Sequence, residues 1–350
     1  MLEMLRAGAR FFQKYIGWNR IGVLLSLAII AVAAVVLVHM LRDIKVDEVV
    51  AALKAIERKH IAAAAAFVAG GYFTLTFYDL FALRTIGHPE IPYRIAALSG
   101  FTSYSIGHNI GATVFTGGAV RYRIYSAYGL NAIEVAKICF IAGLTFWLGN
   151  ATVLGLGVFH SPQAAGWLDH LPNLFNRCIA GAILAVLVAY LGWVWSAPRE
   201  IGRGEWKVRL PSGPSTLLQI CIGIFDLGCC ALAMYMLLPG EPNIGFVTLA
   251  VVFVSATMLG FASHAPGGLG VFDAAMLVAL WQFDKESVLA GLLIFRLLYY
   301  LAPFSVALLI LGVREVLIYL RGMQPKPAHP AVRASGPLRS EIEGRKINAD

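Results

Sequence analysis

Long apolar stretches separated by short polar segments dominate the sequence. A helix needs about 20 mostly apolar residues to cross a bilayer. Six stretches approach or exceed that length: residues 21–40, 61–83, 135–159, 178–195, 217–238 and 288–311. This pattern predicts an all-α polytopic membrane protein with about six full spans.

Two further apolar regions are interrupted by polar, glycine-rich sequence. The first interruption covers residues 107–126 and contains the pair Gly117-Gly118, and the second covers residues 263–273 and contains Gly267-Gly268. Unpaired backbone groups cost several kcal/mol each in lipid, so a broken segment persists only where protein or a water-filled cavity surrounds it. One break in each half of a chain is typical of a transporter's binding site.

The distribution of lysine and arginine predicts which loops face the cytoplasm. The N-terminus, the loop 199–209 and the C-terminal tail are basic, whereas the loops 160–176 and 239–245 contain no lysine or arginine. Both termini are therefore expected in the cytoplasm. The loop at residues 41–60 disagrees with this orientation, because it holds five basic residues on the predicted outer side. We keep the orientation that the majority of the loops indicates.

This orientation requires each broken region to enter and leave on one side of the membrane. Residues 95–131 then form a hairpin of two half-helices from the cytoplasmic side, and residues 246–285 form one from the outer side. The segments around Asp79 and Asp226 are alike, and a glycine pair follows each. We therefore predict an inverted-topology repeat. The expected regions are a basic N-terminus 1–20, repeats 21–160 and 177–313, and a disordered tail 321–350.

Composition agrees with a membrane protein and excludes several other classes. The chain has 350 residues, of which 59% are hydrophobic and 14% charged, against roughly 25% charged in soluble domains. The net charge of +8 is concentrated in loops and ends, so it does not indicate nucleic-acid binding. Its five cysteines form no CxxC or metal-ligand pattern. Nucleotide-loop, HExxH and GxSxG motifs are absent, so we expect no cofactor, metal site or catalytic residues.

Charged residues within apolar segments are candidate functional residues. Arg296 is a candidate ligand for phosphate or carboxylate, or alternatively the partner of Asp226, Asp79 or Asp273 in a buried ion pair. Arg121 and Arg123 are candidates for receiving a lipid phosphate, or alternatively for anchoring at the interface.

Other polar residues near the breaks have two readings each. Asp79 and Asp226 suit a cationic headgroup or a proton, or hydrogen bonds between helices. His108 and His264 suit a proton relay, or the satisfaction of freed backbone groups. At the breaks, half-helix N-termini suit an anionic headgroup, with close helix packing as the alternative. The remaining candidate substrate-binding residues are Asn109, Gly117, Gly118, Gly267 and Gly268.

Two motifs resemble one known family. Residues 117–130 resemble part of the membrane domain of bacterial lysylphosphatidylglycerol synthases, also called multiple peptide resistance factors. Residues 266–272 resemble a later motif of that domain, and Arg296 with Pro303 resembles its last helix; the resemblance covers roughly residues 15–320. It implies a flippase domain that moves aminoacylated phosphatidylglycerol to the outer leaflet. The family's soluble aminoacyltransferase domain has no counterpart in this sequence, so the resemblance implies a stand-alone, non-enzymatic flippase.

These observations predict a lipid translocase of the bacterial inner membrane that moves an anionic or aminoacylated phospholipid. The alternative is a non-transporting membrane subunit that scaffolds a lipid-modifying enzyme, for example one that aminoacylates phosphatidylglycerol. Expected partners are the phospholipid itself, a separate lipid-modifying enzyme and a second copy of the chain.

Overall fold

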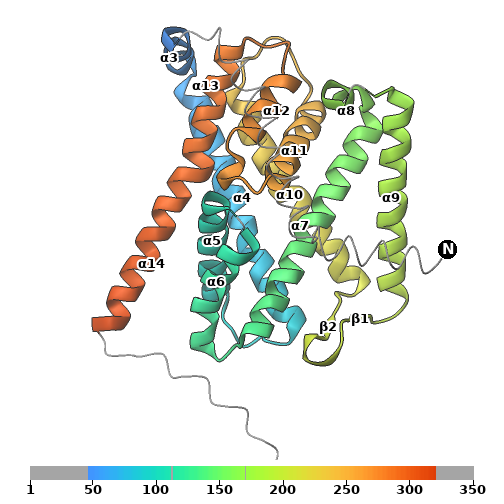
Figure 1. The fold of residues 1–350 in the computed structure, drawn as a ribbon, viewed down its shortest axis with the longest axis vertical. Coiled ribbons are helices and arrows are strands. Elements are labelled where there is room, and N and C mark those ends of the chain that lie inside the picture. Colours follow the sequence, from blue (N-terminus) through green and yellow to red (C-terminus); the bar gives the residue numbers. More distant parts are fainter. Residues whose placement is uncertain (1–45, 112, 170, 321–350) are drawn as a thin grey trace, which may run out of the picture.

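The computed structural model describes residues 46–320, except residues 112 and 170, as a bundle of helices with one short β-hairpin (Figure 1). The predicted span at 21–40, the basic segment 1–20 and the tail 321–350 lie outside the described residues.

Five helices in the described part of the chain are long and apolar enough to cross a membrane. Each overlaps one of the five predicted spans in that part, so the all-α membrane fold is confirmed. The last one contains α13 (Lys285–Arg296), a π-helical turn η4 (Leu297–Leu301) and α14 (Ala302–Leu320). The others are α4 (Arg58–Ile86), α7 (Ala132–His160), α9 (Asn173–Ser196) and α10 (Gly213–Leu237).

Shorter elements join these helices. α3 (Val46–Ala55) precedes α4, and α8 (Pro162–Asp169) lies between α7 and α9. Strands β1 (Glu200–Ile201) and β2 (Val208–Arg209) pair antiparallel around η2 (Gly204–Trp206), between α9 and α10.

Local sequence explains where several helices start and stop. At the start of α7, the Asn131 side chain accepts a hydrogen bond from the Glu134 N–H at 2.9 Å, and the Glu134 carboxylate accepts one from the Asn131 N–H at 2.8 Å. This reciprocal pair satisfies two N–H groups that the first helical turn leaves unpaired. The end of α4 is Gly87, whose φ of 97° is readily adopted only by glycine.

The two interrupted regions each form two helices joined by a bend. The first is α5 (Tyr93–Ile110) and α6 (Thr113–Tyr125), followed by η1 (Ser126–Tyr128). The second is α11 (Phe246–Ala262), the short turn η3 (Pro266–Gly268) and α12 (Val271–Ala279). In Figure 1 the first pair occupies the lower half of the bundle and the second pair the upper half, with their bends facing each other.

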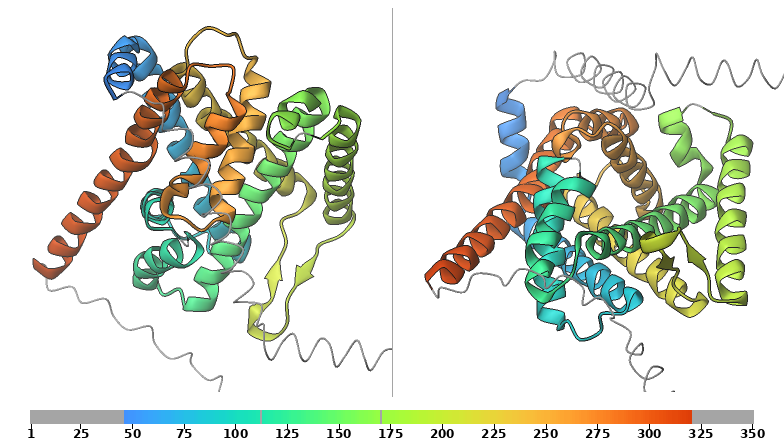
Figure 2. Two further views of the ribbon diagram at one scale, coloured as in Figure 1. Left: turned by 45° about the horizontal axis from the view of Figure 1, so that its top comes forward. Right: turned by 60° about the horizontal axis from the view of Figure 1, so that its bottom comes forward.

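The interior of the bundle is built around α4 and α10, which pack closely against each other. In the most apolar 18-residue stretch of α10, 56% of the residues are buried inside the protein, compared with 11% in the corresponding stretch of α9. Figure 2 shows α9 and α14 at opposite edges of the bundle, where their apolar side chains face outward. The interior helices carry the polar residues discussed below.

Glycine allows α7 and α10 to approach at backbone contact. A Cβ atom added to Gly149 would lie 2.7 Å from the Cα atom of Gly223, which is closer than packed atoms tolerate. By contrast, a Cβ atom added to Gly143, on the same helix, meets nothing within 4 Å. Small residues at such crossings are typical of helix packing in membranes.

Replacing Gly149 with alanine should therefore force α7 and α10 apart. We expect the overpacking to lower the free energy of unfolding by about 1–3 kcal/mol. The midpoint of thermal unfolding in detergent should fall accordingly. Gly143→Ala is the matched control and should leave the midpoint unchanged or raise it slightly. Equal midpoints for the two variants would contradict the close crossing at Gly149.

Candidate functional site

The two bends are in direct contact at the centre of the protein. Gly111, at the end of α5, has a φ of 83°. A Cβ atom there would lie 3.3 Å from the carbonyl oxygen of His264 and 3.3 Å from the Cα atom of Pro266. His264 itself has a φ of 56°, rare for a residue with a side chain. Two chain breaks from opposite halves of the sequence therefore form one junction.

Asn109 ties this junction to the last span. Its amide donates to the carbonyl oxygen of Ser105 at 2.8 Å and to that of Tyr300 at 3.0 Å. Tyr300 lies in the π-helical turn η4. Where the helical hydrogen-bond pattern is irregular, a carbonyl oxygen needs an outside partner when it is buried. Asn109 provides that partner, which is a structural role for this candidate.

Arg121 forms a buried ion pair with Asp79. Its Nε lies 3.0 Å and its Nη2 2.8 Å from Oδ1 of Asp79, and the Tyr125 hydroxyl donates to Oδ2 at 2.8 Å. Arg121 is 4% exposed and Asp79 is 0% exposed. The guanidinium also lies over the Tyr104 ring, 4.8 Å from its centroid. Arg121 is therefore buried, and its charge is neutralised within the protein.

Arg296 forms the second such pair, with Asp273. Its Nε and Nη2 atoms lie 2.9 Å and 2.5 Å from the two carboxylate oxygens, and Nη1 donates to the Gly267 carbonyl at 3.2 Å. The Asp273 carboxylate also accepts from the Gly270 N–H at 3.0 Å. Of the three aspartates predicted as partners, Asp273 is the one observed. Arg296 thus contacts the second broken region at two points, the backbone carbonyl of Gly267 and the side chain of Asp273.

The glycine pairs occupy different places in the two broken regions. Gly267 and Gly268 lie at the second bend with φ values of 58° and 60°. Gly117 and Gly118 lie within α6, where a Cβ on Gly117 would be 3.1 Å from the Ser103 carbonyl oxygen. Their role in the fold is close packing of α6, and the first bend falls at Gly111 instead.

Two further candidates, Arg123 and His108, differ in exposure. The side chain of Arg123 is 52% exposed and pairs with Glu315 of α14 at 2.5 Å. His108 is half-buried between the rings of Tyr104 and Tyr299, at centroid distances of 5.6 Å and 6.0 Å. Its Nδ1 atom has no hydrogen-bond partner in the described part of the chain.

A cavity of about 290 Å³ lies beside the junction of the bends. Exposed apolar side chains, including Phe115, Trp147 and Phe261, lie among the residues that form its wall. Both broken regions and the central helix α10 contribute polar or glycine positions to the wall: Tyr104, His108, Gly111, Arg121, Asp226, Thr257, His264, Gly267 and Gly268. The cavity therefore combines an apolar surface with a few polar groups, as ligand sites commonly do.

Asp226 is the one cavity-lining carboxylate. It is 5% exposed, and the Tyr78 hydroxyl donates to its Oδ2 at 3.1 Å. Its Oδ1 has no hydrogen-bond partner among the described residues. Tyr78 and the cavity tyrosines Tyr104, Tyr299 and Tyr300 were not among the predicted residues. Tyr78 directly precedes Asp79 in the sequence but donates to Asp226 of α10, so the sequence carries no signal for this pairing.

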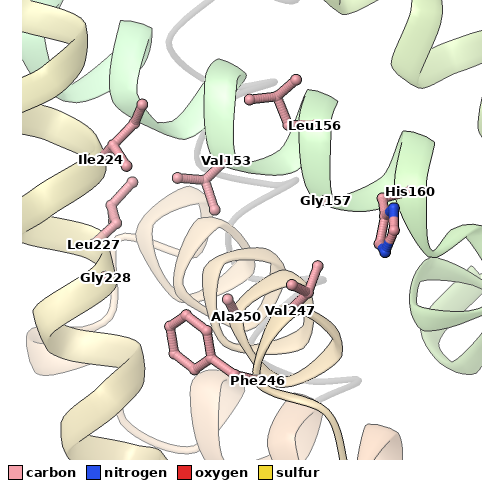
Figure 3. A pocket seen from close by; sticks show the side chains of 10 residues that line it. All are labelled: Val153, Leu156, Gly157, His160, Ile224, Leu227, Gly228, Phe246, Val247 and Ala250. Carbon is pink, nitrogen blue, oxygen red and sulfur yellow. The ribbon is translucent and has the colours of Figure 1, made fainter.

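A second cavity, of about 280 Å³, lies between α7, α10 and α11 (Figure 3). Figure 3 shows aliphatic side chains and Phe246 around it, with His160 at one end. Among its lining residues only His160 has a polar side chain. This cavity offers almost nothing to a polar headgroup, so the central cavity is the candidate site.

Related proteins place the chain in a family. No protein-family model matches it. It is 31% identical to the uncharacterized protein slr0712 of Synechocystis, over 80% of this chain and 87% of that protein. It is also 28% identical to the inner membrane protein YbhN of Escherichia coli, over 79% of this chain and 86% of YbhN. The chain belongs to the slr0712/YbhN family.

The chain is also similar to part of a larger enzyme. This chain is 25% identical to the phosphatidylglycerol lysyltransferase of Staphylococcus haemolyticus. The match covers 80% of this chain and 32% of the enzyme. The chain thus spans about a third of that relative. The resemblance predicted from residues 117–130 and 266–272 is confirmed.

The Arg121–Asp79 pair can be tested by removing one charge at a time. Arg121→Gln should destabilise the protein by about 3–5 kcal/mol, because it leaves a buried carboxylate without its cation. The double variant Asp79→Asn/Arg121→Gln should be more stable than Arg121→Gln alone. The midpoint of thermal unfolding in detergent measures both effects.

The control is Arg123→Gln, on the same helix but in an exposed pair. Its effect should stay within about 0–1 kcal/mol. A loss of stability in Arg121→Gln no larger than in Arg123→Gln would show that the buried pair does not stabilise the fold.

Proposed function

We propose that the protein moves a phospholipid between the leaflets of the bacterial inner membrane. The observation that carries the proposal is the central cavity, which lies where the two broken regions meet and is lined by both of them. Discontinuous helices that meet near a cavity are the usual form of a transporter's binding site. The kinship with YbhN, an inner membrane protein, supports the location.

The proposed substrate is an anionic or aminoacylated phospholipid. The lysyltransferase relative acts, by its name, on phosphatidylglycerol, which supports a lipid of that kind. Phe115, Trp147 and Phe261 are exposed to the surroundings of the bundle and also line the cavity. An acyl chain would remain against these apolar side chains while the headgroup enters the polar part of the cavity. The thirteen-residue helix α6 contributes both apolar and polar groups to this path.

We further propose that the two halves form an inverted repeat around this cavity, with six full spans and both termini in the cytoplasm. The packing of the helices supports this arrangement. In the first half, α5 packs against α14 of the second half; in the second half, α11 packs against α7 of the first. The central helices α4 and α10, which carry Asp79 and Asp226, pack against each other.

A second candidate function is a membrane subunit that scaffolds a separate lipid-modifying enzyme. The match to about a third of a lysyltransferase favours this candidate, because there the related region belongs to a longer enzyme. In either case we propose no catalysis by this chain. A stoichiometric enzyme recovered with the purified protein, together with absent lipid movement, would favour the scaffold.

Filling the cavity tests the transport function directly. Gly143 lines the cavity, and a Cβ atom there meets nothing within 4 Å, so Gly143→Phe should place a ring in the cavity without disturbing α7. Purified protein is incorporated into liposomes containing fluorescent phosphatidylglycerol, and an impermeant quencher is added outside. The wild type should expose inner-leaflet label to the quencher, and Gly143→Phe should reduce this to the rate of protein-free liposomes.

Gly192→Phe is the matched control. Gly192 lies on α9, away from the cavity wall, and it also has open space around it. This variant should transport like the wild type. Transport by Gly143→Phe at the wild-type rate would contradict passage through the central cavity, and no lipid movement by the folded wild type would contradict the transport function.

A further inference from the structure

Three buried aspartates lie in the centre of the bundle, and two of them have an arginine. Asp79 pairs with Arg121, and Asp273 pairs with Arg296. Asp226 forms no ion pair in the part of the chain that the structure describes; its only hydrogen bond there is the one from Tyr78. In the sequence, Asp226 corresponds to Asp79. In the described residues, the position equivalent to Asp79 in the second half therefore keeps the acid but has no arginine paired with it.

Among the described residues, the surroundings of Asp226 provide no arginine or lysine that is free to compensate its charge. Arg121 lines the same cavity, but Asp79 holds its guanidinium. α11 lines the cavity with Phe253, Thr257, Gly260 and Phe261, which do not titrate, and α9 and α13 place no residue in its wall. The titratable side chains near Asp226 or in the wall are Tyr72 and Tyr78 of α4, Tyr104 and His108 of α5, Arg121 of α6, Cys139 of α7, Cys229 and Cys230 of α10, His264, and Tyr299 and Tyr300 of η4.

The geometry leaves one carboxylate oxygen free to carry a proton. The Tyr78 hydroxyl occupies Oδ2, whereas Oδ1 has no partner and Asp226 lines the cavity. This oxygen is buried and faces Gly71 of α4, where an added Cβ atom would lie 3.5 Å from it, at ordinary van der Waals contact. An ionised carboxylate that is buried without a cation is strongly disfavoured and takes up a proton instead.

We propose that Asp226 is a proton-binding site in the central cavity and that its proton is exchanged during each transport cycle. Oδ1 is buried in this structure, so the carboxyl group must first turn this oxygen toward the cavity, where it loses the proton to water and regains it from water. The proton site rests on the geometry alone. Its coupling to lipid movement rests on the proposed function.

Labelling with a carbodiimide tests the proton site without any lipid. Dicyclohexylcarbodiimide is soluble in membranes and reacts with protonated carboxyl groups, leaving an adduct that peptide mass spectrometry locates. In the purified full chain we expect an adduct on Asp226 that decreases as the pH rises. Asp79 and Asp273, ionised in their pairs, should remain unlabelled. Tyr78→Phe removes the hydrogen bond to the ionised form, so labelling should extend to higher pH in that variant.

A second measurement does not depend on access of the reagent. Infrared difference spectra between acidic and alkaline pH should contain a protonated-carboxyl band that Asp226→Asn lacks and Asp79→Asn retains. The proton site is overturned if this band is unchanged in Asp226→Asn. It is also overturned if Asp226 is unlabelled, labelled equally at every pH, or labelled no more than Asp79.

Liposomes with an imposed pH gradient test the coupling separately. The rate of lipid movement by the wild type should depend on the gradient, and that dependence should be lost in Asp226→Asn. Lipid movement that ignores the gradient in the wild type overturns the coupling and leaves the transport function standing. Labelling at Asp226 without any lipid movement overturns the transport function and leaves the proton site standing.

Discussion

A helix that stops inside a membrane leaves backbone groups without partners, and this constraint organises the protein. The first four N–H groups and the last four carbonyl groups of a helix have no partner within it, and lipid offers none. Here the second break is closed partly by a residue from elsewhere in the sequence, because Arg296 satisfies the Gly267 carbonyl. The first broken region provides such a partner in turn, because Asn109 satisfies the Tyr300 carbonyl of the last span. The second broken region is therefore not complete by itself.

Buried charges in this protein also need partners, because lipid offers none. Arg121 and Arg296 are each matched to a carboxylate, so two strong charges are held inside the bundle without a net charge. Each pair also joins separate elements: Arg121 connects α6 to α4, and Arg296 connects the last span to α12. The arginines therefore act first as structural links of the broken regions. This leaves Asp226 as the carboxylate, among the described residues that line the cavity, that has no arginine partner.

The fold was largely predictable from the sequence, because lipid permits few alternatives to long apolar helices. The five predicted spans in the described residues and the two interruptions are present. The details of the site were less accessible. Glycine serves both bends and close packing, and the sequence does not distinguish the two. The structure shows that Gly117 packs against Ser103 from within a helix, whereas Gly111, with a positive φ, forms the bend. Arg296 had three candidate aspartates, and only the three-dimensional arrangement selects Asp273. The predicted binding roles of these residues remain predictions.

The π-helical turn in the last span has a mechanical consequence. Residues 285–320 form one long rod that contacts the second bend through Arg296 and the first bend through the Tyr300 carbonyl, four residues further on. The same rod also meets α6 near its far end, where Glu315 pairs with Arg123. The last span is therefore bonded to both bends, so a tilt of this span would act on both of them. Separating either bend from the last span would require these hydrogen bonds to break.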